Sequence, residues 1–393
     1  MRVRELTAYI VRLPLRRRIR HASHVRVSTD NLIVRCTLAD GTEGYGEGVP
    51  RDYVTGETAE SALALLKQTD WPGQLAGAAG DCADFPAAVA LADALQLAPV
   101  PGDQRGCAGN AARCAVELAL LDAFGRHFHQ PLSTLTKLIA PALYRPQARV
   151  RYGFAITGAR GLKLVLAALV ARFYRFADVK LKVGIAGYDD VKRLRWLRRL
   201  VRRSVRVRLD ANEAYDASEA ADRIAQLEPF GIDWIEQPLP HEQAEALARL
   251  RRQVRVPIML DESVCSLRDA QQAVAGQWCD LVNVRLSKCG GFIPSLRLMQ
   301  YVTAEGLGCQ LGCQVGESAL LSAAGRHFAC SVAGLRAVEG SYDRHLLYHS
   351  LSRRDLTFGY GGWAGALTGG GLGVEVDTPT LDRLALRKEL LFA

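Results

Sequence analysis

Short apolar segments alternate with helical patterns from about residue 148 to residue 341, and this alternation constrains the fold more than any other feature of the sequence. Strands that alternate with helices pair in parallel, because each helix returns the chain to the same end of the sheet. Eight such strands are what a closed barrel requires, so we predict an α/β fold built on a modified, TIM-like (β/α)8 barrel. The eight segments are VRYGFAI, ADVKLKVG, VRVRLDAN, IDWIEQPL, VPIMLDES, DLVNVRLSK, LGCQLGCQ and LRAVEGS.

The segments on either side of this region predict a second, α+β unit. Residues 32–38 and the segment after Asp40-Gly41 form a predicted hairpin, because Asp-Gly is a strong turn signal. Residues 111–126 carry apolar side chains at helical spacing. The glycine-rich tail predicts loops and a short strand at 372–376 that returns to the first unit. We therefore expect an α+β unit at 1–130, the barrel at 131–350 and a returning tail at 351–393.

Composition and charge exclude several kinds of protein. Of the 393 residues 49% are hydrophobic and 23% are charged, which is typical of a globular protein with a large core. No apolar run is long enough to span a membrane, and the first 20 residues lack the apolar core of a signal peptide. We therefore expect a cytoplasmic protein with no membrane partner.

The net charge of +9 raises the alternative of nucleic-acid binding. No known binding motif or aromatic-interleaved basic stretch accompanies the charge, so we expect no nucleic-acid partner. The basic run at 192–203 contains leucines at helical spacing, which predicts a solvated helix face. A zinc site at Cys309 and Cys313 is not favoured, because no second ligand pair follows.

Polar residues at the ends of the predicted strands recur with the period of one strand–helix unit. Each step therefore places the next residue at a similar height on the next strand, at the end where such barrels carry their chemistry. The series is Lys182, Asp210, Glu236, Asp261, Lys288, Gln314 and Glu339, at intervals of 28, 26, 25, 27, 26 and 25 residues.

Three consecutive strands end in the carboxylates Asp210, Glu236 and Asp261. Carboxylates that converge on one rim repel each other unless a cation lies between them. Oxygen ligands select a hard ion, so we predict a Mg²⁺ site, with Mn²⁺ as an alternative. The competing interpretation pairs each carboxylate with a barrel arginine such as Arg206 or Arg208, but it leaves the matched heights unexplained.

Two neighbours extend the predicted metal site. Asn212 lies two residues after Asp210 on the same side of the strand, where it could orient a metal ligand. Glu262 follows Asp261, and we expect it to hold Lys288 by an ion pair.

Lys180 and Lys182 lie two residues apart on one strand, so both project to the same face, which we predict is the barrel interior. A lysine base near neutrality needs a pKa about three units below its ordinary value, or about 4 kcal/mol. A second lysine charge at about 6.7 Å supplies about 2.5 kcal/mol at an effective dielectric of about 20. A divalent cation could supply the rest. Lys288 is predicted across the mouth from Lys182, so the two could serve opposite faces of one carbon.

These motifs resemble those of the enolase superfamily, in its muconate lactonizing (mandelate racemase/muconate cycloisomerase) subgroup. The resemblance implies that Lys182 and Lys288 are the acid/base pair, that Lys180 assists them, and that the three carboxylates bind the metal. It also implies that the N-terminal unit, with its GYGEG sequence, and the tail form a capping domain. The matching segments are VKLKVG, LDAN, WIEQPL, LDES, LSKCGG, GYGEG and GLGVEVD.

The resemblance implies removal of the α-proton of a small carboxylate substrate to give a metal-stabilised enediolate. We expect an isomerase, either a muconate-type cycloisomerase or a racemase/epimerase. The alternatives are a lyase of the o-succinylbenzoate synthase type and a catalytically silent binding barrel. An even-numbered homo-oligomer is common in the family and is expected here.

The substrate is not defined by the sequence. Dipeptide epimerases of the family carry Asp-x-Asp at the eighth strand, whereas this chain has Glu339 and Ser341 in VEGSYD. Glu339 could take one half of that role. The predicted substrate contacts are His21, His24, Tyr53, Gln314 and Glu339.

Overall fold

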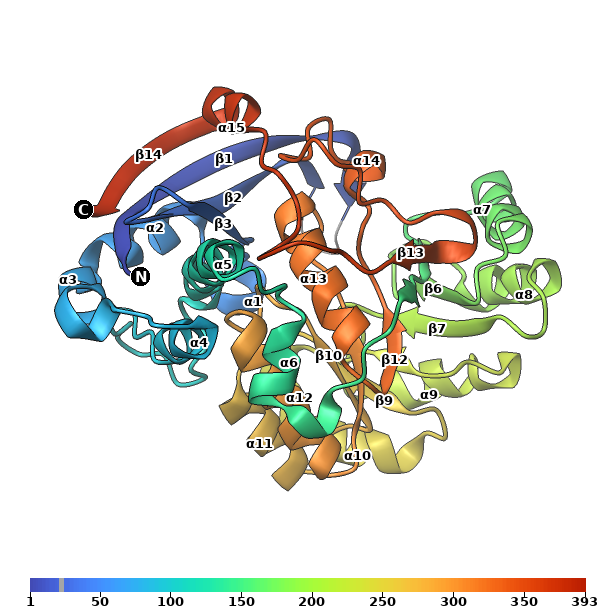
Figure 1. The fold of residues 1–393 in the computed structure, drawn as a ribbon. Helices are drawn as coiled ribbons and strands as arrows, with labels where there is room; N and C mark the ends of the chain where they lie inside the picture. Colours follow the sequence, from blue (N-terminus) through green and yellow to red (C-terminus); the bar gives the residue numbers. More distant parts are fainter. Residues whose placement is uncertain (21–24) are drawn as a thin grey trace.

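The computed structural model describes residues 1–20 and 25–393. It contains an eight-stranded parallel sheet and a separate four-stranded antiparallel sheet (Figure 1). The predicted combination of a parallel α/β unit with a separate α+β unit is therefore confirmed. The boundaries at 130/131 and 350/351 remain a prediction.

The parallel sheet contains its strands in the order in which they occur in the chain. Strands buried on both faces are typical of a parallel sheet covered by helices. A backbone hydrogen bond of 2.9 Å from the N–H of Gly153 to the oxygen of Val338 links the two outermost strands, so the sheet curls on itself (Figure 1). The strands are β5 (Phe154–Ile156), β6 (Asp178–Lys182), β7 (Arg206–Asp210), β8 (Ile235–Glu236), β9 (Ile258–Leu260), β10 (Leu281–Val284), β11 (Gly308–Leu311) and β12 (Leu335–Val338).

A helix follows each of the first seven of these strands, as the sequence pattern predicts. The basic run lies on α8, where Leu194 and Leu197 are buried and most of the arginines face solvent. The helices are α7 (Leu162–Phe173), α8 (Asp190–Leu200), α9 (Ala220–Ala225), α10 (Ala244–Gln253), α11 (Leu267–Ala275), α12 (Phe292–Ala304) and α13 (Ala319–Ser331). Shorter elements are η3 (Glu228–Phe230), η4 (His241–Gln243), α14 (Asp343–Leu346), η5 (Tyr360–Gly362), and the paired strands β4 (Arg149–Arg151) and β13 (Trp363–Gly365).

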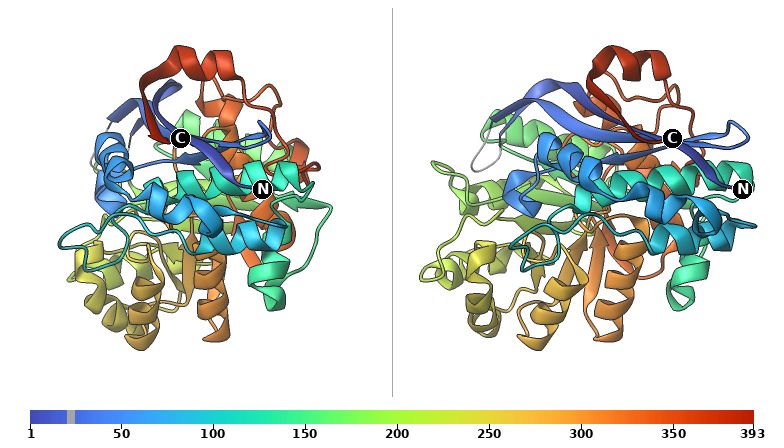
Figure 2. Two further views of the ribbon diagram at one scale, coloured as in Figure 1. Left: turned by 60° about the vertical axis from the view of Figure 1, so that its left-hand side comes forward. Right: turned by 90° about the vertical axis from the view of Figure 1, so that its left-hand side faces the viewer.

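The antiparallel sheet has the strand order β14-β1-β2-β3 and forms a cap on the parallel sheet (Figure 2). Its strands are β1 (Val3–Arg20), β2 (Val25–Leu38), β3 (Glu43–Gly48) and β14 (Ala385–Phe392). The predicted hairpin is confirmed as β2 and β3, which pair antiparallel around Gly41. The other elements of this unit are α1 (Asp52–Thr55), α2 (Ala59–Gln68), α3 (Trp71–Leu75), η1 (Gly77–Gly80), α4 (Phe85–Asp93) and α5 (Asn110–His127), followed by α6 (Thr134–Ile139) and η2 (Pro141–Leu143).

The tail returns to the cap through β14 and not through the strand that we predicted at 372–376. Gly371 and Gly373 have φ values of +64° and +66°, which interrupt an extended conformation, and Val376 makes only an isolated bridge to Ser352. After α15 (Thr378–Leu384), the uninterrupted segment 385–392 pairs with β1 instead.

The GYGEG sequence packs β3 directly on α5. A Cβ at Gly46 would lie 2.1 Å from the backbone oxygen of Ala115, and a Cβ at Gly44 would lie 2.0 Å from the backbone nitrogen of Ala123. Such distances are far inside van der Waals contact, so the spacing of these glycines follows from the close approach of strand and helix.

Two buried glutamates, Glu47 and Glu117, join the cap to the parallel unit, and we call them the junction carboxylates. Glu47 on β3 accepts hydrogen bonds from Ser318 and Leu321 at the start of α13. Glu117 on α5 accepts the N–H groups of Phe292 and Ile293 at the start of α12, at 2.5 and 3.2 Å. Helix N-termini favour carboxylates because their first N–H groups have no partner within the helix. These helix starts follow strand ends, so the cap lies over the carboxyl ends of the parallel strands.

No helix in the described part of the chain is both long enough and apolar enough to cross a membrane.

Candidate functional site

The three predicted metal ligands lie side by side at the carboxyl ends of β7, β8 and β9. The strand register pairs Asp210 with Glu236, and Glu236 with Met259, two residues before Asp261. All three carboxylates are buried, with at most 1% of each residue exposed. The parallel register is what brings together side chains that are 51 residues apart in the chain.

Two cationic side chains lie between these carboxylates. Lys180 Nζ is 3.2 Å from Asp210 and 3.5 Å from Glu236. Arg285 forms an ion pair with Asp261 and lies 3.7 Å from Glu236. Within the described residues, the one group of three potential ligands whose atoms all lie within 4.8 Å of one another is Glu213, His241 and Glu242, not the predicted trio. Because Lys180 and Arg285 lie between the predicted ligands, an ion bound there would have to displace these two cations.

The donor set nevertheless fits a hard divalent ion. Three buried carboxylates from adjacent strands are the oxygen ligands that Mg²⁺ takes. Burial raises the pKa of Glu236 to about 7, although Lys180 acts in the opposite direction. A carboxyl group in this position ionises readily only if additional positive charge is placed beside it.

Lys180 is held as a buried cation. Its Nζ is 2.9 Å from Glu339, in addition to its contacts with Asp210 and Glu236. Burial opposes the charge on Lys180, but Glu236 and the other carboxylates outweigh this effect and raise its pKa well above the usual value. Lys180 is therefore suited to neutralise an anion and not to take up a proton.

Lys182 is the more accessible of the two lysines on β6. It is partly exposed, whereas the side chain of Lys180 is 7% exposed. Its Nζ donates to the side-chain oxygen of Asn212, and the Asn212 backbone N–H donates to Asp210 at 3.1 Å. Asn212 thus joins the base predicted on β6 to the ligand predicted on β7, although it touches Asp210 through its backbone and not through its side chain.

Lys288 lies beside the predicted metal ligand Asp261, and its position across the mouth from Lys182 remains a prediction. Its side chain is fully buried, and its Nζ donates to the backbone oxygens of Asp261 and Asn283, both at 2.7 Å, and to Asp261 Oδ1 at 3.0 Å. A second cation after β10, Arg285, also forms an ion pair with Asp261. Arg285 directly follows β10 and continues the face of Asn283, whereas Lys288 lies three residues further, in the following turn.

The predicted ion pair between Glu262 and Lys288 does not form in the structure, because Lys288 pairs with Asp261. Glu262 is buried, its Oε2 has no hydrogen-bond partner, and burial raises its pKa well above the usual value. The competing interpretation, in which each carboxylate pairs with a barrel arginine, holds only for Asp261, which pairs with Arg285, and for Glu236, which lies 3.7 Å from the same guanidinium. Arg208 pairs with Asp178 and Glu339 and not with Asp210.

Sequence reasoning missed the interior residues Asn283 and Gln310, and it considered Arg208 only as a competing partner of the carboxylates. Asn283 donates to Glu236 at 2.8 Å, and Gln310 donates to the other oxygen of Glu236 at 3.2 Å. Arg208 donates to Gln310 at 2.8 Å. The two-residue alternation of the strands, followed inward from the predicted ligands, could have identified all three.

The predicted substrate contacts lie in different parts of the structure. Gln314 is buried, and its side-chain oxygen has no hydrogen-bond partner in the described structure. Tyr53 lies in the cap beneath the guanidinium of Arg26, 5.4 Å from the ring centroid. His21 and His24 lie outside the described residues.

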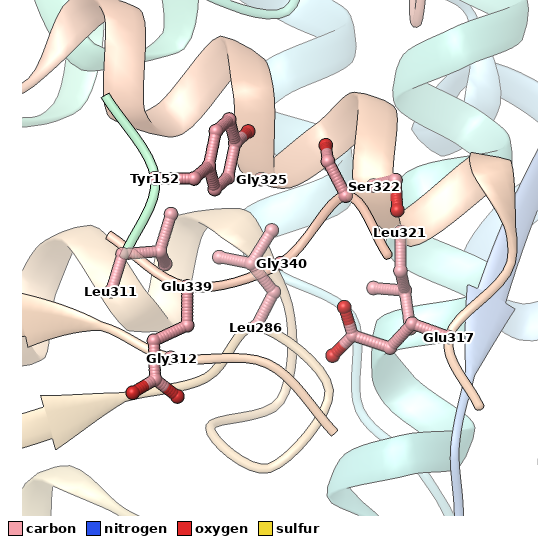
Figure 3. A pocket seen from close by; sticks show the side chains of 11 residues that line it. Tyr152, Leu286, Leu311, Gly312, Glu317, Leu321, Ser322, Gly325, Glu339 and Gly340 are labelled. Atoms are coloured by element: carbon pink, nitrogen blue, oxygen red, sulfur yellow. The ribbon is translucent and has the colours of Figure 1, made fainter. Parts of the chain in front are cut away.

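Glu339, which contacts Lys180, also lines a small cavity. The cavity measures about 10 Å³, enough for roughly one water molecule. Figure 3 shows Glu317 and Glu339 among the side chains that line it, with Tyr152 and Ser322 near α13. Burial raises the pKa of Glu317 to about 8, whereas Lys180 and Arg208 outweigh burial and lower that of Glu339.

Residues 164–380 match the family described as enolase C-terminal domain-like, and they make up more than half of the chain. The chain belongs to the enolase superfamily. This superfamily was predicted from the strand-end motifs, and the relatives of the chain fall in the predicted subgroup.

The N-succinyl-L-Arg/Lys racemase of Bacillus cereus is 29% identical over 86% of this enolase-superfamily chain and 87% of its own length. A crystal structure of the N-succinyl Arg/Lys racemase from the same organism has a TM-score of 0.85 at 28% identity, covering 99% of this chain and 100% of its own. Muconate cycloisomerase 1 of Rhodococcus opacus is 29% identical over 83% of each chain.

A dipeptide epimerase from Cytophaga hutchinsonii, crystallised with Mg and the dipeptide D-Ala-L-Val, has a TM-score of 0.83 at 24% identity and covers all of both chains. These relatives are isomerases. The expectation of an enzyme of the isomerase type is therefore confirmed.

Proposed function

We propose that this protein is a Mg²⁺-dependent isomerase that removes the α-proton of a small carboxylate substrate, within a parallel sheet closed as a modified (β/α)8 barrel. The observation that carries the proposal is the buried row of Asp210, Glu236 and Asp261 on adjacent strands, with Lys182 partly exposed beside it. When bound there, Mg²⁺ would supply positive charge that stabilises the negative charge developing on the deprotonated substrate.

The two lysines of the site would have different roles in the reaction. Lys182, as the neutral amine, would take the α-proton, and Asn212 would hold its Nζ in place. Lys180, which is held as a cation, would neutralise the substrate carboxylate. The cap lies over the strand ends and would exclude water from the reacting carbon.

The relatives suggest the substrate classes to test. They act on N-succinyl amino acids, dipeptides and muconate, all of which carry a carboxylate next to an acidic or unsaturated carbon. Cycloisomerisation and racemisation or epimerisation are the leading reactions, and a lyase of the o-succinylbenzoate synthase type is the alternative.

The test is exchange of the α-hydrogen in D₂O. Purified protein with Mg²⁺ is incubated with N-succinyl amino acids, dipeptides and muconolactone, and deuterium incorporation is followed by NMR. We expect exchange that disappears with EDTA and in Lys182→Ala, and that persists in Lys163→Ala, a control at an exposed lysine of α7. Exchange that persists in Lys182→Ala would contradict the proposal, and a new alkene with a released leaving group would identify a lyase. No exchange with any compound would favour the binding-barrel alternative.

A further inference from the structure

Helix α7 is apolar on its outer face as well as on the inner face that packs on the parallel sheet. Its inner side chains, such as Leu164 and Ala168, are buried. The outer side chains recur at helical spacing and are between 45% and 73% exposed; they are Leu162, Leu166, Val170 and Phe173, and we call them the α7 outer face. A helix that is apolar all round is normally covered on all sides, because one apolar stripe is enough to pack on a core. The α7 outer face therefore lacks a partner in the described structure.

The neighbouring helix α8 has the ordinary amphipathic pattern that α7 lacks. It packs against α7 and buries Leu194 and Leu197, while Lys192, Arg195 and Arg199 face solvent. Both helices lie at the periphery of the parallel unit, on the side away from β14 (Figure 1). The exposed apolar side chains of α7 are thus a property of this helix and not of its place in the fold. Contiguous exposed apolar surface of this kind marks an interaction site.

Two exposed tyrosines extend the α7 outer face at the C-terminal end of the helix. Tyr360 in η5 donates its hydroxyl to the backbone oxygen of Phe173 at 3.0 Å. The rings of Tyr360 and Tyr174 lie 5.5 Å apart, centroid to centroid, and both are exposed. Tyrosine combines an apolar ring with a polar hydroxyl, so it is suited to the boundary between water and an apolar medium.

Basic side chains on α7, on α8 and beside them have no acidic partners. Between residues 160 and 203, a stretch that the structure describes throughout, Asp189 is the only exposed acid. The nearby Asp190 is already paired with Arg193. The exposed bases of this stretch form no ion pair with any described residue, and they include Arg160, Lys163, Arg172, Arg175, Arg195 and Arg199. This part of the surface therefore combines apolar side chains with a strong excess of positive charge.

An anionic membrane surface matches both properties. Acyl chains accommodate aliphatic side chains, and lipid phosphates bind arginine and lysine. A nucleic acid also offers phosphates, but leucine and valine give its bases no ring to stack on. A second copy of this chain would bring the same excess of positive charge to the contact. Charge complementarity together with the aliphatic side chains therefore favours lipid over both.

We propose that α7 docks this protein on the surface of an anionic membrane. The α7 outer face enters the boundary between headgroups and acyl chains, and the surrounding arginines and lysines bind lipid phosphates. At 12 residues the helix is too short to cross a bilayer, so it lies along the surface. We expected no membrane partner because no apolar run could span a bilayer, but a helix that lies on a membrane needs no such run. The docking is independent of the proposed function.

Sedimentation of the whole chain with lipid vesicles tests the proposal. Vesicles of phosphatidylcholine alone are compared with vesicles that also contain about 30% phosphatidylserine and therefore carry a negative surface potential. We expect binding to the anionic vesicles that weakens with rising salt concentration, and much weaker binding to the neutral vesicles. Equal binding to both kinds of vesicle, or binding to neither, would overturn the proposal.

The apolar contribution is tested by a double variant on the α7 outer face. Leu162→Gln with Leu166→Gln should bind anionic vesicles at least ~10-fold more weakly than the wild type, because two leucines no longer enter the bilayer. The matched control is Leu386→Gln with Leu390→Gln, which changes two exposed leucines of β14 and should bind as the wild type does. Equal affinities of the two double variants would overturn the docking through α7.

The charged contribution is tested in the same way. Each lysine or arginine near an anionic surface strengthens binding about fivefold, so Lys163→Gln with Arg175→Gln should bind about 25-fold more weakly. The control is Arg252→Gln with Arg255→Gln, at two exposed arginines in and after α10, and it should stay close to the wild type. Equal losses in both pairs would show that net charge, and not this surface, determines the binding.

A fluorescent probe on the helix measures insertion directly. Leu166→Cys can be labelled with an environment-sensitive fluorophore, since the native cysteines are all buried or partly buried. We expect its emission to shift to the blue with anionic vesicles, and the emission of labelled Leu386→Cys to stay unchanged. An unshifted probe on α7 would overturn the proposal. A wild-type dimer that the Leu162→Gln and Leu166→Gln changes convert to a monomer, without any vesicle binding, would also overturn it and identify a second copy as the partner.

Discussion

Lys288 Nζ lies 3.0 Å from Oδ1 of Asp261 and 2.7 Å from the backbone oxygen of the same residue. One ammonium thus fixes both the side chain and the backbone of a predicted metal ligand. Replacing it with an apolar residue would remove this donor from Oδ1 of Asp261 and from two buried backbone oxygens.

We therefore predict that Lys288→Met lowers the free energy of unfolding by about 3–5 kcal/mol, as for a broken buried ion pair. Lys182→Met should lower it by less than about 1 kcal/mol, because Lys182 is partly exposed and bonds only to Asn212 among the described side chains. Urea unfolding of the two variants side by side tests this. Similar losses in both would show that Lys288 is not the structural lysine.

Metal binding should stabilise the protein through the three carboxylates. A ligand that binds only the folded state at a hundredfold excess over its Kd adds about 2.7 kcal/mol to the free energy of unfolding. We expect Mg²⁺ to raise the midpoint of thermal unfolding of the wild type, and to have little effect on Glu236→Gln. Potassium chloride at matched ionic strength is the control, and an equal Mg²⁺ effect in both proteins would place the ion elsewhere.

The contact between β3 and α5 should not tolerate a methyl group. A Cβ at Gly46 would overlap the backbone oxygen of Ala115, and backbone cannot move aside as a flexible side chain can. We expect Gly46→Ala to destabilise the protein by more than about 3 kcal/mol, beyond the usual range for overpacking. Gly41→Ala is the control, because a Cβ there has no neighbour within 4 Å and only the φ of +87° is unfavourable.

The Gly41→Ala variant should lose about 1–2 kcal/mol, the cost of a left-handed residue with a side chain. Thermal and urea unfolding of both variants give the comparison. A Gly46→Ala protein that is as stable as Gly41→Ala would show that the strand and the helix can separate.

His327 should make the fold sensitive to mild acid. Burial lowers its pKa to about 4, and its Nε2 lies 3.1 Å from the backbone oxygen of Leu372. Above pH about 6.5 the imidazole is neutral in the folded and unfolded states, so it contributes no pH dependence. Below that value the unfolded chain binds a proton that the folded protein does not bind until about pH 4. The stability therefore falls with decreasing pH across this window, by about 3 kcal/mol in total.

The variant His327→Gln should lack the part of the pH dependence of the free energy of unfolding that comes from this histidine. Urea unfolding between pH 7.5 and 4.5 should give a flatter profile for it than for the wild type. His129→Gln, at an exposed histidine, should keep the wild-type slope, and parallel profiles for all three proteins would contradict the assignment.

The strand–helix period defined much of the fold and the row of predicted metal ligands, because parallel strands reach one rim at regular intervals along the chain. The same period did not reveal the other polar residues near the strand ends. It missed Arg285 and Gln310, because an interval of about 26 residues does not indicate on which residue a strand ends. Strand alternation would have indicated both residues, since Arg285 continues the face of Asn283, and Gln310 donates to Glu236 as Asn283 does.

The contacts between the cap and the parallel unit could not be predicted from the sequence. Glu47 and Glu117 give no local signal that they meet the starts of α13 and α12, because these pairings join residues far apart in the chain. The returning strand was also misplaced, since its pairing with β1 depends on tertiary structure and not on composition.

The junction carboxylates have a consequence for how a substrate enters. Lifting the cap as a rigid body would pull Glu47 and Glu117 away from the helix starts that satisfy them, leaving N–H groups and carboxylates bare in apolar surroundings. Such a hinge motion would cost free energy on every turnover. We therefore expect the cap to stay in place as a whole and the substrate to enter and leave through small rearrangements at its edge.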